Sequence, residues 1–280
     1  MPKRQLSLGA RFRLGLIINT SFMAFEFVVG LVTGSLALVA DAAHNLTDSV
    51  TLVISWIAER MSKKPADNTH TLGHGRIGIM AALINGTILM TTAAVIFFEA
   101  YQRFIHPLPI QGGVVAATAF VGIVANGAVA LLFRRFRSDL NVKAAYLNMA
   151  FDMLFSIAAM IAGFLILITH QTWIDAVVGV GIGVGLLYAA FGIVRQATNI
   201  FLEGVPRNVN IKDIRSAIRS HPGVKKLSRL YVWAIDSNDY AACCIIRPSN
   251  KSHERTEETR KELEAILKEL GFNLVIIEIR

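Results

Sequence analysis

Several side chains that can bind metal or carry protons lie at helical spacing inside long apolar stretches of the sequence. Asp41, His44 and Asp48 are separated by three and four residues, which places them on one face of a helix. A later apolar stretch carries Asp152, with Asn148 one helical turn before it. The imidazole of His44 and the carboxylates of Asp48 and Asp152 form a ligand set suited to a divalent first-row cation.

These side chains are informative because they lie where lipid is expected. An ionisable group inside a membrane helix costs at least a few kcal/mol, so it generally faces a cavity or a partner and serves a function. The alternative interpretation is a hydrogen-bonded network that only holds helices together. We favour a metal or proton site over such a network.

The stretches that must position these groups are long enough to cross a membrane. The chain has 280 residues, 54% hydrophobic and 17% charged, whereas soluble domains carry roughly 25% charged residues. This composition argues against a soluble globular protein. Six apolar runs each approach or exceed the length of about 20 residues that a membrane helix needs. We therefore predict six transmembrane helices, at Leu14–Val32, Leu36–Ile57, Ile77–Phe98, Val114–Phe133, Ala144–Ile168 and Trp173–Val194.

The distribution of charge predicts both the topology and a domain boundary. Thirteen Lys and Arg residues before residue 206 fall on one side of the predicted membrane, and only Arg103 falls on the other. This bias places both termini in the cytoplasm, and it explains the net charge of +8 without a nucleic-acid partner. Half of the 28 basic and half of the 20 acidic residues lie in 207–280. We predict a membrane domain over 1–206 and a soluble domain over 207–280.

The soluble part has the pattern of a small α+β domain with αββαβ order, which is ferredoxin-like. Helical spacing of apolar residues and a charged amphipathic segment indicate its two helices, and alternating runs indicate its strands. The predicted elements are Ile211–Ser220, Leu227–Ile235, Tyr240–Arg247, Glu254–Leu270 and Asn273–Ile279.

A further set of potential ligands lies in the loop between the second and third apolar runs. Asp67, His70 and His74 fall within eight residues. Three such side chains can bind a metal ion, although exposed loop histidines are more often merely solvated. We treat this loop as a second and weaker candidate metal site.

Three segments together resemble one known family. The sequence GSLALVADAAHNLTD over residues 34–48, the loop PADNTHTLGHGR over 65–76 and LEGVP over 202–206 are similar to those of the cation diffusion facilitators. The resemblance implies a homodimeric secondary transporter in the lipid bilayer, of the kind found in bacterial inner membranes. It would export Zn²⁺ or a related divalent cation from the cytoplasm in exchange for protons, and it would need no prosthetic group.

The resemblance also implies a four-ligand transport site. His44 and Asp48 match its first pair of ligands, and Asp152 matches the acid of its second pair. Asn148 stands where zinc exporters of the family usually have histidine. Because an amide oxygen is a harder and weaker ligand than imidazole, this difference favours Mn²⁺, Fe²⁺ or Co²⁺ as alternatives. Zinc remains our first choice.

Two other positions follow from the resemblance. It suggests an ion pair between Arg76 and Glu203 near the dimer interface. It also implies a tail that dimerises without the metal centre common in the family, because histidines are missing from Ser228–Trp233 and Asn273–Glu278. We interpret Cys243 and Cys244 as buried structural residues.

Functions of other classes fit the sequence less well. An ATP-driven pump is disfavoured because the chain has no Gly-x-x-x-x-Gly-Lys-Ser/Thr loop. An intramembrane hydrolase would use the paired acids, but the chain has no His-Glu-x-x-His motif, and we expect no enzyme activity. A membrane metal sensor whose tail signals to a partner stays open, and a measurement of metal flux would separate it from a transporter.

Overall fold

The computed structural model describes residues 7–33, 36–105, 112–169, 173–250 and 252–280. Some side chains inside the helices, that of His44 among them, lie outside this description. The chain divides into two compact units, Met1–Arg195 and Gln196–Arg280. The second unit includes the end of the last long helix, which the sequence-based boundary at residue 206 assigns to the membrane part.

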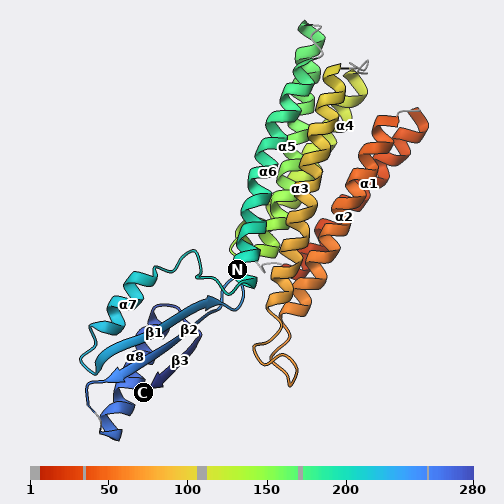
Figure 1. Cartoon of the computed structure of the whole chain (residues 1–280). Helices are drawn as coiled ribbons and strands as arrows, with labels where there is room; N and C mark the ends of the chain where they lie inside the picture. Colours follow the sequence, from red (N-terminus) through yellow and green to blue (C-terminus); the bar gives the residue numbers. More distant parts are fainter. Residues whose placement is uncertain (1–6, 34–35, 106–111, 170–172, 251) are drawn as a thin grey trace, which may run out of the picture. The chain divides into compact units, whose positions relative to one another are not determined.

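Within the described residues, the long helices are α1 to α6 (Figure 1), and each of the six predicted apolar runs lies inside one of them. Four described stretches have the length and apolar character needed to cross a membrane, namely Leu8–Val29, Arg76–Gln102, Ala119–Phe136 and Gly179–Phe201. A short 3-10 helix, Arg134–Phe136, links α4 to the region before α5. The bounds are α1 Leu8–Thr33, α2 Leu36–Ser62, α3 Arg76–Ile105, α4 Gly112–Phe133, α5 Leu140–Thr169 and α6 Trp173–Phe201.

Helix α2 has a polar inner face and an apolar outer face. It contacts α1, α3 and α5, and its polar residues Asp48 and Ser55 are buried. Its apolar residues Leu46, Val50 and Ile57 are about half exposed. This pattern suits a helix in lipid, because hydrocarbon surrounds the apolar side chains while polar groups must find partners inside the protein.

Small residues let α4 approach α5 closely. A Cβ atom added at Gly122 would lie 2.8 Å from Ser156 Oγ and 3.2 Å from the Phe22 ring, and one at Gly127 would lie 3.0 Å from Met153 Sδ. Glycine at such contacts is common between membrane helices because it allows close backbone packing. The two glycines therefore set the position of the part of α5 that carries Asp152.

The second unit contains the predicted αββαβ order. Its elements are α7 Ile211–Arg219, β1 Val224–Ala234, β2 Tyr240–Pro248, α8 His253–Glu269 and β3 Leu274–Ile279. The sheet has the order β1-β2-β3, with β2 antiparallel to β1 and parallel to β3. Strand β1 begins three residues earlier than predicted, because Val224 already pairs with Pro248 of β2. The pairing has two register shifts between Val224 and Arg229.

The core of this unit lies on one face of the sheet. Ile214 and Ile218 of α7 and Leu263 and Leu267 of α8 form a buried cluster with strand residues that include Cys244. The neighbouring row Tyr231, Cys243 and Ile276 is paired across the three strands, and alternation places it on the opposite face. Tyr231 and Ile276 are nearly half exposed, so this second face is partly open.

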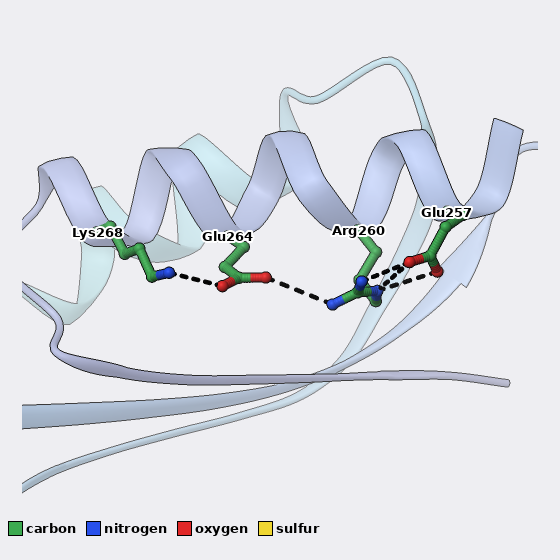
Figure 2. Close-up of polar contacts among 4 residues, drawn as sticks. All are labelled: Glu257, Arg260, Glu264 and Lys268. Carbon is green, nitrogen blue, oxygen red and sulfur yellow. Dashed lines mark hydrogen bonds and ion pairs between the residues drawn. The ribbon is translucent and has the colours of Figure 1, made fainter.

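Charged side chains follow one side of α8 (Figure 2). Arg260 contacts both Glu257 and Glu264, and Lys268 contacts Glu264 at 2.7 Å. Spacings of three and four residues bring these groups together on one helix face. Hydrogen bonding to Arg260 lowers the pKa of Glu257, and hydrogen bonding to Lys268 lowers that of Glu264. Such a charged surface suits contact with water.

Helix α6 ends in a turn that normally favours glycine. Glu203 has φ of 56°, its backbone N–H donates to Ile200 O at 3.1 Å, and Gly204 N–H donates to Asn199 O at 2.8 Å. This is the Schellman pattern, whose left-handed residue is usually glycine. A left-handed non-glycine residue costs roughly 1–2 kcal/mol, and such strain often marks a functional position.

We predict that Gly122→Val destabilises the helical unit, because its side chain would overlap Ser156 and Phe22. The expected result is a lower yield of monodisperse protein and a melting temperature reduced by several degrees, measured in detergent by tryptophan fluorescence. The matched control is Gly192→Val in α6, where no described atom lies within 4 Å of the added Cβ. Equal melting temperatures for both variants would contradict the close packing of α4 on α5.

Candidate functional site

Three of the four predicted transport-site residues meet between α2 and α5. Asn148 donates its Nδ2 to Asp48 Oδ1 at 2.8 Å and approaches Asp152 Oδ2 at 3.5 Å. Asp48 and Asn148 are buried, with exposed fractions of 3% and 5%, and Asp152 is partly buried. The carboxylates of Asp48 and Asp152, which come from two different helices, thus share one amide.

The side chain of His44 lies outside the described residues. Its backbone belongs to α2, one turn before Asp48, so the helical spacing places both residues on the same face. Its role as a ligand stays a prediction.

The electrostatics of this site favour a cation. Asp48 and Asp152 bring two acidic groups into a setting of low dielectric constant, where an opposite charge is stabilised more than in water. Their local bonds hold the surrounding backbone, because Thr51 Oγ1 donates to Asp48 O at 2.8 Å and Ser156 Oγ donates to Asp152 O at 3.1 Å. Carboxylate and amide oxygens bind hard divalent ions, and added imidazole suits zinc.

A separate polar cluster joins α1 to α2. Glu26 is almost completely buried and accepts a hydrogen bond from Asn45 Nδ2. Asn19 Nδ2 donates to Asn45 O and Ser49 Oγ, both at 3.1 Å. Asn45 of α2 is thus one partner of Glu26, and these side chains form a polar contact between α1 and α2.

Two further buried amides contact α2 and were not singled out as site residues by the sequence. Asn85 of α3 and Asn141 of α5 both hydrogen-bond to Ser55. The available signal was the presence of an amide within or beside an apolar run. That signal does not reveal which residues meet, because it contains no information on the register between helices.

The loop candidates Asp67, His70 and His74 also lie together. Each offers one ligand atom, and these atoms lie within 4.8 Å of one another. His70 Nδ1 is 3.6 Å from Asp67 Oδ1, and His74 Nε2 is 3.5 Å from Asp67 Oδ2. The loop geometry therefore suits a metal ion, with Asp67 at the centre.

Local hydrogen bonds fix the Asp67 carboxylate. Its Oδ1 accepts from Thr69 Oγ1 at 2.7 Å and from the backbone N–H groups of Thr69 and His70 at 2.8 and 2.7 Å. The Thr69 hydroxyl, and after it these N–H groups, hold the pKa of Asp67 well below its usual range. Gly73, with φ of 78°, supplies the left-handed turn that brings His74 back toward Asp67.

Arg76 begins α3 in the first unit, and Glu203 follows α6 in the second. Their ion pair stays a proposal.

The tail cysteines are poorly suited to bind metal. Burial raises the pKa of Cys244 to about 11, with a smaller contribution from Cys243. Burial and the nearby Glu278 raise the pKa of Cys243 as well. Because metals bind the thiolate, these shifts favour the structural interpretation.

The sequence of this chain is similar to those of known cation efflux proteins. The family model of the cation efflux transmembrane domain matches residues 12–202. The cadmium, cobalt and zinc/H⁺-K⁺ antiporter of Bacillus subtilis is 29% identical over 95% of this chain and 86% of its own length. The metal cation efflux system protein CzcD of Cupriavidus metallidurans is 35% identical, covering 80% and 72%. The zinc transporter ZitB of Escherichia coli is 34% identical, covering 78% and 71%.

We predict that Cys244 is nearly inert toward thiol reagents in the folded protein. Because the pKa of Cys244 is raised from its ordinary value of 9.0 to about 11, the folded protein keeps the thiol protonated and unreactive at neutral pH. The protonated thiol contributes stability below pH 9.0, and this contribution is lost as pH rises toward 11. The measurement is the labelling rate of a Cys243→Ser variant, which retains Cys244 alone, at several pH values between 7 and 10. Labelling should be slow at pH 8, rise with pH and become fast in denaturant. Fast labelling of the native variant at pH 7 would contradict the burial of Cys244.

Proposed function

Because this chain belongs to the cation efflux family, we propose that it exports a divalent metal cation from the cytoplasm in exchange for protons. Zn²⁺ is the first choice of substrate. Family membership makes the chain an integral membrane transporter rather than an enzyme, which removes the hydrolase alternative. A sensor remains distinguishable by experiment, because a sensor binds the ion without moving it across the membrane.

The observation that carries the proposal is the contact of Asn148 with both Asp48 and Asp152. We infer that these three residues and His44 hold the transported ion. In the described geometry the amide nitrogen faces the carboxylates. When a cation enters between the two carboxylates, a half-turn of the amide would present its oxygen to the ion. Asn148 would thus donate hydrogen bonds to the acids before the ion binds and serve as a ligand afterwards.

Proton exchange follows from the chemistry of the proposed ligands. A histidine or carboxylate must be deprotonated to bind metal, so binding releases protons and protonation favours release of the metal. If the site opens alternately to each side, protons from the outside can reset it. The B. subtilis relative is an H⁺-K⁺ antiporter by name, which supports this coupling. A pH-sensitive dye inside metal-loaded proteoliposomes would test it.

The proposed assembly has six membrane-crossing helices, both termini in the cytoplasm and two copies of the chain. The Lys and Arg bias supports the orientation. The partly open sheet face with Tyr231 and Ile276 supports a tail dimer in which this face is covered. Crosslinking of the full-length protein in native membranes would detect that dimer.

Asn148 provides the reason for the second substrate candidate. Two carboxylates and an amide oxygen suit Mn²⁺, Fe²⁺ or Co²⁺ better than a site with two imidazoles does. Uptake by everted vesicles across a panel of divalent ions would rank them. We also propose that Asp67, His70 and His74 bind a further metal ion, which predicts that Asp67→Asn reduces the number of ions bound per chain.

We predict that Asp48→Ala and Asp152→Ala each abolish transport. Each substitution removes a ligand and a charge that offsets the cation in a low dielectric. The measurement is Zn²⁺ uptake into proteoliposomes, with gel filtration to show that the variants fold. Asp213→Ala, which removes an exposed acid of α7, is the matched control. Full transport by either membrane variant would refute the site.

Replacement of Asn148 by histidine should raise the preference for Zn²⁺ over Mn²⁺, because imidazole suits zinc. Transport should also become more sensitive to cytoplasmic acid, since the new imidazole must lose a proton, which an ordinary histidine does near pH ~6.5. Competition between the two ions at pH 6 and pH 8 measures both effects. An unchanged preference and pH profile would show that Asn148 serves only in packing.

Charge reversal tests the proposed ion pair. Arg76→Glu and Glu203→Arg should each reduce transport, and the double variant should recover a substantial part of the loss, because the pair would be restored with opposite orientation. The strained backbone of Glu203 supports a role for its side chain, since glycine would relieve the strain. Purely additive losses in vesicle transport would exclude the pairing.

A further inference from the structure

A second polar contact between α2 and α5 lies beside the proposed transport site. Asn141 Nδ2 donates to Ser55 O at 2.9 Å, in parallel with the donation from Asn148 to Asp48. Ser55 follows Asp48 by seven residues, and Asn141 precedes Asn148 by seven. The two helices are therefore antiparallel. The two contacts lie about 10 Å apart along the helix axis. We call each contact a rung and the α2–α5 interface that holds both the seam.

A residue of α3 completes the second rung. Asn85 Nδ2 donates to Ser55 Oγ at 2.6 Å and to Thr51 O at 3.5 Å. Ser55 has no measurable exposure, and Asn85 and Asn141 are 2% and 1% exposed. Three helices thus place uncharged polar groups around one buried point of α2.

Both amides turn their nitrogen toward α2. Asn141 Nδ2 donates to the backbone carbonyl of Ser55, so reversing this amide would set one oxygen acceptor against another. Asn85 Nδ2 donates to the Ser55 hydroxyl and, at 3.5 Å, to Thr51 O. Both Oδ1 atoms consequently face away from those carbonyls. Among the described residues, neither Asn85 Oδ1 nor Asn141 Oδ1 has a hydrogen-bond partner, and both atoms are buried. Buried acceptors normally have one, so these two oxygens call for a ligand.

In the proposed topology, the rung lies between the cytoplasmic end of α2 and Asp48 along the helix. Glu59, one turn beyond Ser55, is buried at 8% exposure and lines a cavity of about 360 Å³ with Trp56. Arg13, Arg60 and Lys63 also line this cavity, so its charge does not retain a cation. The next polar groups toward Asp48 are those of the rung.

We propose that Ser55, Asn85 and Asn141 form a neutral station at which the divalent cation pauses on its way to Asp48 and Asp152. Amide and hydroxyl oxygens can replace part of the hydration shell of a hard or borderline divalent ion. Because they carry no net charge, they hold the ion weakly enough to pass it to the carboxylates, as conduction through successive sites requires. The inference rests on the proposed function.

The experiment compares transport rate with equilibrium binding in the full-length protein. Asn141→Leu and Asn85→Leu remove the amide oxygens, and each should lower initial Zn²⁺ uptake at subsaturating metal by roughly tenfold. Their Kd for Zn²⁺ at the Asp48 site, measured by titration calorimetry, should stay within about twofold of the parent. Asn126→Leu is the matched control, because Asn126 is an equally buried amide of α4 outside this rung. Its uptake should equal that of the parent.

A gain-of-binding variant makes the test independent of the leucine substitutions. Asn141→Asp adds a carboxylate to the rung, and it should retain one additional Zn²⁺ per chain in equilibrium dialysis while transport slows. Parental uptake by both leucine variants, or no additional ion in Asn141→Asp, would overturn the station and leave bound water as the ligand of the two oxygens. Failure of the proposed function gives a different result, namely a parent protein that moves no metal or an Asp48→Ala variant with unchanged uptake.

Discussion

The need to satisfy polar groups inside an apolar helical unit governs this structure. Lipid offers no hydrogen bonds, so the buried polar side chains of α2 need partners within the protein. Asn19 of α1, Asn85 of α3 and Asn148 of α5 supply those partners. The same groups that hold α2 in place therefore line the centre of the unit.

In the proposed transport site, one set of residues would serve both helix packing and ion binding. Glycines of α4 bring α5 close, and α5 aligns Asn141 and Asn148 with Ser55 and Asp48 in a single antiparallel register. Charged and neutral rungs then follow one another along the seam. A cation moving along it would meet weak oxygen ligands before strong carboxylates, an order that favours movement toward the acids.

The sequence was most informative where the pattern is local. Apolar runs located the helices, and every boundary of the tail elements was predicted to within three residues. Both succeed because period and turn signals depend only on neighbouring residues. The spacing of Asp41 and Asp48 defined a face of α2, but contacts between distant helices depend on register, which a single sequence does not contain. For that reason the pairing of Asn141 with Ser55 and of Glu26 with Asn45 was missed, while the family resemblance supplied the link between Asp48 and Asp152.

Anomalous X-ray scattering at the zinc edge from crystals of the zinc-loaded protein would test the central claim directly. The account predicts a peak between α2 and α5, with carboxylate oxygens of Asp48 and Asp152 at about 2.0–2.2 Å from the ion. Fully occupied zinc peaks elsewhere, for example at Asp67 in the loop, with none between these two helices would contradict it.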